Sequence, residues 1–152
     1  MPGKSLTFHS TVLHKSIRET DSTFNQYLKS LDTISNDIRN LENYLREKGV
    51  THNFSYFAGS YLPEEKASFI TWRYCESAKK YRLFYTVMVW NDPDDEFNKP
   101  TQESIEWEKP LIETESAIRM SVFPALPEFI KSLAEEVKVL QRKAVVSILG
   151  TS

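Results

Sequence analysis

Apolar residues recur every three or four positions in two long segments, one toward each end of the chain. From residue 21 or 22 to residue 48 they fall on one face of a helix, and Asp21 and Ser22 are suitable N-cap residues. Gly49 follows the last turn, as glycine often does. The second helix begins near Pro127, which suits a first turn. The apolar positions are, in the first segment, Phe24, Leu28, Leu31, Ile34, Ile38, Leu41 and Leu45, and in the second, Leu126, Phe129, Ile130, Leu133, Val137, Leu140 and Ala144.

Between the two helices, apolar and polar residues alternate with the period of a β-strand. Residues 53–62 predict one strand, residues 67–90 a hairpin that turns at 76–80, and residues 109–122 a fourth strand. Short polar connections favour antiparallel neighbours. The sequence therefore predicts an α+β fold: a four-stranded antiparallel meander flanked by a long N-terminal helix and a C-terminal helix, in a single domain covering residues 1–152.

The second strand of the hairpin is apolar on both faces. Leu83, Tyr85 and Val87 alternate with Phe84 and Met88, so each side of the strand needs cover. We expect helices, or a second protein molecule, to supply the two layers.

The two ends of the chain hold more apolar surface than one small core needs. The N-terminal helix would measure about 40 Å at 1.5 Å per residue, which exceeds a ten-residue strand. Its apolar spacing suits a coiled-coil seam, although Ser35 and Glu42 make that seam less apolar. At the other end of the chain, residues 144–149 stay mostly apolar. We expect a homodimer or another protein partner. Residues 1–20 are predicted to be a loosely held arm, in which residues 6–14 fit a strand or a helix.

Composition points to an ordinary soluble protein. The 152 residues are about 40% apolar and 26% charged with a net charge of −2, so no overall field attracts nucleic acid or an anionic membrane. A secretion signal and an apolar run of about 18 residues are both missing, and we expect no membrane contact. The single cysteine, Cys75, fits a reducing compartment, which predicts a cytoplasmic location.

Motifs for metal, cofactor or covalent chemistry are missing. His9, His14 and His52 lack the spacing of metal ligands, and 4 glycines are too few for a phosphate-binding loop. The sequence therefore predicts no metal and no cofactor.

Two groups of side chains still invite a functional interpretation. Residues 72–85 combine aromatic and basic side chains, including Lys79, Lys80 and Tyr81, as single-stranded nucleic-acid readers do. Glu113, Glu115 and Arg119 share the wet face of the predicted fourth strand, where two carboxylates about 7 Å apart would serve a hydrolase. Our leading hypothesis is a non-catalytic protein-binding or self-associating module, with nucleic-acid binding and hydrolysis as alternatives. Its tentative binding surface comprises Trp72, Arg73, Tyr74, Arg82, Phe84, Tyr85 and Trp90.

Overall fold

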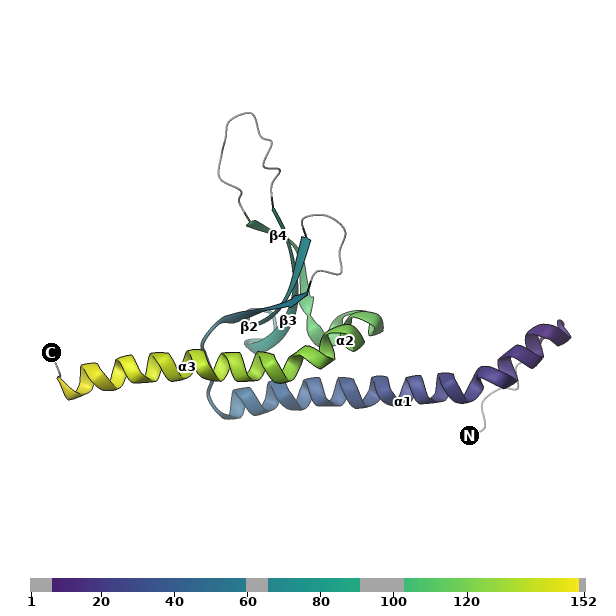
Figure 1. The fold of residues 1–152 in the computed structure, drawn as a ribbon, viewed down its shortest axis with the longest axis horizontal. Helices are drawn as coiled ribbons and strands as arrows, with labels where there is room; N and C mark the ends of the chain where they lie inside the picture. Colours follow the sequence, from purple (N-terminus) through teal and green to yellow (C-terminus); the bar gives the residue numbers. More distant parts are fainter. Residues whose placement is uncertain (1–6, 60–65, 91–102, 151–152) are drawn as a thin grey trace, which may run out of the picture.

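Two long helices lie against one face of a four-stranded antiparallel sheet (Figure 1). The structure, a computed structural model, describes residues 7–59, 66–90 and 103–150. In chain order the elements are α1 (Thr11–Glu47), β1 (Phe54–Gly59), β2 (Lys66–Cys75), β3 (Lys80–Trp90), β4 (Glu103–Pro110), the 3-10 turn η1 (Leu111–Glu113), α2 (Ser116–Val122), the 3-10 turn η2 (Phe123–Ala125) and α3 (Leu126–Leu149). The predicted α+β class and the two terminal helices are confirmed.

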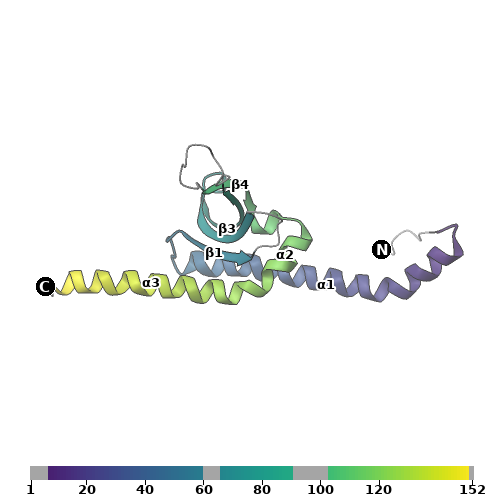
Figure 2. The same ribbon diagram turned by 45° about the horizontal axis from the view of Figure 1, so that its top comes forward.

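The strands follow one another in the order β1-β2-β3-β4, as a meander does. In the central pair Trp72 lies opposite Leu83 and Ile70 opposite Tyr85. The sheet is strongly twisted and curls away from the helices (Figure 2). The hairpin predicted over residues 67–90 is therefore confirmed.

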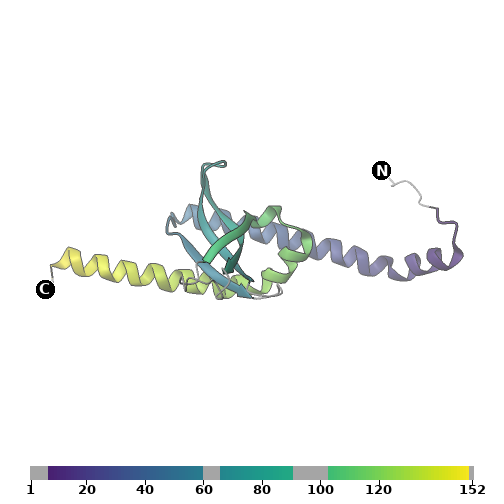
Figure 3. The same ribbon diagram turned by 90° about the horizontal axis from the view of Figure 1, so that it is seen from above.

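The helices α1 and α3 run in the same direction and overlap over only part of their lengths. Leu41 of α1 lies near Ile130 of α3, and Tyr44 and Leu45 lie near Leu133 and Val137, so residue numbers rise together along both helices. Beyond this overlap α1 continues past one side of the sheet and α3 past the other (Figures 1 and 3).

The core lies between the sheet and this overlap. Phe129 is fully buried and its ring contacts those of Phe54 and Tyr56 on β1. Trp72 is also fully buried, and its indole N–H donates to the carbonyl of Val50 at 2.9 Å. Each large apolar side chain buried in this way contributes about 1.5 to 3 kcal/mol. The remaining fully or almost fully buried residues here are Ile38, Leu45, Ile70, Leu83, Val87, Leu111, Val122 and Leu133.

α1 also completes the hydrogen bonding of β3 where β4 ends. β4 pairs with β3 only as far as Phe84, opposite Pro110. Beyond this point the Leu83 N–H donates to the carboxylate of Glu42 at 2.8 Å, and Arg46 donates to the carbonyl of Tyr81 at 2.8 Å. Glu42 is only 4% exposed, and Arg82 lies 3.8 Å from its carboxylate. Two side chains of α1 thus replace the missing strand.

α1 starts ten residues earlier than the sequence analysis placed it. Ser10 is the N-cap, and its hydroxyl accepts from the Leu13 N–H at 3.2 Å. Residues 11–20 of the predicted arm are therefore helical, and the helical interpretation holds for residues 11–14. The first turns bend away from the main axis (Figure 1), where Ser16 and Thr20 hydroxyls bond carbonyls four residues back.

The fourth strand predicted at residues 109–122 is wrong. β4 covers Glu103–Pro110, and the chain then turns into η1 and α2. Leu111 and Val122 are buried at the two ends of this turn, and Thr114 donates to the Leu111 carbonyl at 2.6 Å. Ile118 and Val122 are four residues apart, a helical spacing that an alternating pattern also contains. Ile105 and Trp107, alternating with charged residues, mark the true strand.

Replacing Glu42 with alanine tests how far α1 supports the edge of β3. The Glu42→Ala variant leaves the buried Leu83 N–H without its partner and removes the buried one of the two carboxylates beside Arg82, so we expect a loss of about 2 to 3 kcal/mol in the free energy of unfolding. Urea denaturation measures it. Glu47→Ala, an exposed position on the same helix, is the matched control and should change stability by less than about 0.5 kcal/mol. Equal losses in both variants would contradict the role of Glu42.

Candidate protein-binding surface

Most of the aromatic residues of the predicted binding surface lie inside the protein. Trp72, Phe84 and Tyr85 are at most 5% exposed. Arg73 and Tyr74 remain partly accessible, and Arg82 is mostly covered beside Glu42. Trp90 ends β3, and its side chain falls outside the described residues. The structure therefore does not bring these seven residues together as one exposed surface.

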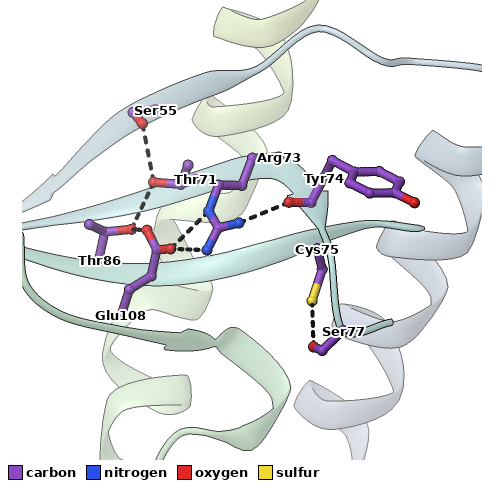
Figure 4. A network of polar contacts seen from close by, with 8 residues as sticks. All are labelled: Ser55, Thr71, Arg73, Tyr74, Cys75, Ser77, Thr86 and Glu108. Atoms are coloured by element: carbon purple, nitrogen blue, oxygen red, sulfur yellow. Dashed lines mark hydrogen bonds and ion pairs between the residues drawn. The ribbon is translucent and has the colours of Figure 1, made fainter. Parts of the chain in front are cut away.

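A polar network covers the face of β3 that points away from the long helices (Figure 4). Arg73 pairs with Glu108 and stacks on the ring of Phe84, with its guanidinium 3.8 Å from the ring centre. Glu108 also accepts from Thr86 at 2.6 Å, and Thr71 bridges Thr86 and Ser55. We expected helices or another molecule to cover this second face of β3. The face is instead covered by the curled sheet itself and by these side chains.

This network weakens the nucleic-acid alternative. The charge of Arg73 is already matched by Glu108. Lys79 and Lys80 are exposed at the hairpin turn, while Tyr74 and Tyr81 lie edge to face against each other. The two rings are thus already engaged with each other, although Tyr74 stays 40% exposed.

The carboxylates of the hydrolase alternative do not share a strand face. Glu113 lies in η1 with its carboxylate 4.0 Å from Arg82, and Glu115 is the N-cap residue of α2. Glu115 lines a cavity of about 380 Å³ beside Trp107. Arg119 donates to the carbonyl of Thr114, within its own turn. Arg119 thus holds the η1–α2 turn, and the two carboxylates lie in a turn and at a helix start instead of on one strand.

In the described part of the chain, no three His, Cys, Asp or Glu side chains gather as a metal ion would require. Among the helices of that part, none is long and apolar enough to cross a membrane.

The most exposed apolar surface of the described chain lies where the two helices pass beyond the sheet. We call residues 11–30 the α1 extension and residues 138–149 the α3 extension. Ile17 is half-buried, and every other residue of the two extensions is exposed. Phe24 is 60% and Ile148 81% exposed. The other exposed large apolar side chains here are Val12, Leu13, Tyr27, Leu28, Val139, Leu140, Val145, Val146 and Leu149.

An apolar groove follows the seam between α1 and α3 where the two helices overlap. A cavity of about 480 Å³ is lined by Leu41, Phe123, Leu126 and Ile130. A second one of about 240 Å³ also touches Ile130 and continues between α1 and α3. Grooves of this kind accept the apolar face of another helix. The apolar pattern of the sequence indicates the surplus apolar surface at both ends, whereas the binding residues predicted from the sequence lie on the sheet.

Comparisons of the chain with protein-family models, with curated proteins and with solved structures find no match.

Cys75 offers a test of the local geometry at the end of β2. The Ser77 hydroxyl lies 3.3 Å from its sulfur and lowers the pKa of the Cys75 thiol, because a donated hydrogen bond stabilises the thiolate. We expect Ser77→Ala to raise this pKa, which the pH dependence of alkylation by iodoacetamide measures. Ser55→Ala, which alters the polar network instead, is the control. An unchanged thiol pKa in Ser77→Ala would contradict the assignment.

Proposed function

We propose that this protein is a non-catalytic self-associating module that forms a homodimer through the exposed apolar face of α1 and α3. The observation that carries the proposal is the heptad pattern of α1. Ile17, Phe24, Leu31, Ile38 and Leu45 follow one another at intervals of seven. The last two are buried in the core, whereas Phe24 stands in the open on the same stripe. A stripe that continues so far beyond its own domain supports a second helical partner.

The composition of the α1 extension strengthens this argument. Of its 20 residues many are β-branched or short and polar, which are modest helix formers, and none is alanine. A helix of this length and composition is marginal in water without tertiary packing. Packing against a second protein molecule would supply the missing stabilisation.

The proposed module acts in the cytoplasm. Cys75 is a buried free thiol, which supports a reducing compartment.

The mass of the protein in solution tests the dimer. At micromolar concentration, light scattering behind a sizing column should give about twice the 17.7 kDa of one chain. Phe24→Glu places a charge on the exposed stripe without touching the core, so we expect it to shift the mass toward one chain. Gln26→Glu, also exposed but off the stripe, should remain dimeric. A wild-type protein that stays monomeric at high micromolar concentration would refute the proposal.

Helix content should depend on protein concentration. Within one chain the α1 extension has little tertiary packing beyond the contact of the Tyr27 hydroxyl with Ser116 of α2 at 2.7 Å. Far-ultraviolet circular dichroism should therefore report more helix as the dimer forms. Replacing Ser22 and Asn25, both exposed and off the stripe, with alanine raises the intrinsic helix propensity and should reduce this dependence. A helix content that stays constant while the mass doubles would show that the extension is helical without a partner.

A further inference from the structure

We infer that the dimer has a two-fold axis across the helices, with the α1 extension of each chain running antiparallel along the α3 extension of the other. This inference rests on the proposed self-association and specifies its interface. It is argued from the direction of the helices, their apolar spacing and their charges.

The direction of the helices sets the arrangement. α1 and α3 run parallel, and their extensions leave the sheet on opposite sides (Figure 3). A two-fold axis across the middle of this pair exchanges the two sides, so each α1 extension meets the partner's α3 extension at both ends of the dimer. A simple translation would also pair the extensions, but it leaves free ends and builds an open fibre. The two-fold arrangement covers all four extensions and closes.

The apolar stripes of α1 and α3, followed from the extensions into the overlap, match in antiparallel register. Along α1, Leu13, Ile17, Phe24 and Leu31 are separated by 4, 7 and 7 residues. Along α3 in reverse, the same separations occur between Ile148, Ala144, Val137 and Ile130. Antiparallel helices bring such positions face to face in sequence.

In this register Leu31 meets the partner's Ile130 at the edge of the apolar groove. The axis then passes near residues 34–38 of α1, beside Asp37 and Leu41, which line the groove. The two grooves therefore face each other at the centre of the dimer, between the two pairs of extensions.

Most charged side chains of the two extensions lie away from the apolar stripes. The α3 extension carries Lys138, Arg142 and Lys143 and no acidic residue. On a helical projection at 100° per residue, Asp21 and Asp32 flank the α1 stripe, while Lys15, Arg18 and Lys29 lie on the far side. On the α3 extension Lys138 borders the stripe, whereas Arg142 and Lys143 lie on the far side, so the two apolar stripes can meet without burying most of these charges. An anionic membrane would also attract the basic α3 extension, but it leaves the longer α1 extension uncovered.

Cysteine cross-linking between two different chains tests the arrangement. In a Cys75→Ala background, one chain carries Ile17→Cys and a second chain carries Ala144→Cys, and the two are mixed, equilibrated and oxidised. We expect a covalent dimer in the mixture and at least several-fold less in either chain alone. Gln26→Cys, exposed and off the stripe, mixed with Ala144→Cys is the matched control and should cross-link weakly. Light scattering before oxidation confirms that each variant still associates.

The outcomes separate this inference from the proposed function. Efficient cross-linking of the Ile17→Cys chain with itself, or of the Ala144→Cys chain with itself, would show that like extensions pair and would overturn the arrangement. A dimer by mass that gives no cross-link in the mixture would overturn it as well, with self-association intact. A monomer by mass, including one whose α3 extension binds vesicles containing phosphatidylserine, would refute both.

Discussion

The junction between α1 and the open edge of β3 holds the architecture together. β3 is an inner strand that pairs with β2 on one side and with β4 on the other. The pairing with β4 ends at Phe84, and without α1 the next backbone groups of β3 would be buried without hydrogen-bond partners. Glu42 and Arg46 supply those partners from a helix. The position of α1 on the sheet is thereby fixed by directional bonds as well as by apolar packing. α3 then packs on α1 and β1, and the lengths of both helices beyond the sheet follow from this placement.

Several aromatic and charged residues of the sheet contact other residues of the same chain. On one face Trp72 and Tyr85 are buried beneath the helices. The indole N–H of Trp72 also donates to the carbonyl of Val50, in the connection that follows α1. On the other face Arg73 and Glu108 form a mostly shielded ion pair over Phe84. A residue engaged in this way contributes to folding and has little left for a ligand. Most of the exposed large apolar side chains lie on the helices, although Phe57, Tyr74 and Ile105 are also exposed on the sheet.

Each of the two long helices therefore has one part that packs in the core, the overlap, and one part that extends beyond the sheet. Ile38 and Leu45 bury the α1 stripe in the overlap, and Phe24 and Leu28 expose it beyond the overlap. A monomer would hold about twenty residues of weakly helix-forming sequence away from any core, which costs conformational entropy without compensating contacts. In the proposed dimer each such segment lies on the partner's basic α3 extension, and association and helix formation become one process.

The sequence by itself determined the elements whose periodicity is strong and local: the helix pattern of residues 24–45, the hairpin between Lys66 and Trp90, and the C-terminal helix from its proline. It misplaced β4, because the alternation of residues 112–122 also contains the spacing of a short helix. It named Trp72, Phe84 and Tyr85 as a surface, because aromatic residues on both faces of a strand look alike whether they are buried or exposed. Only the tertiary structure decided these points. Burial depends on the curl of the sheet and on contacts between residues far apart in the chain, such as Glu42 with Leu83 and Arg73 with Glu108, and no local pattern records those contacts.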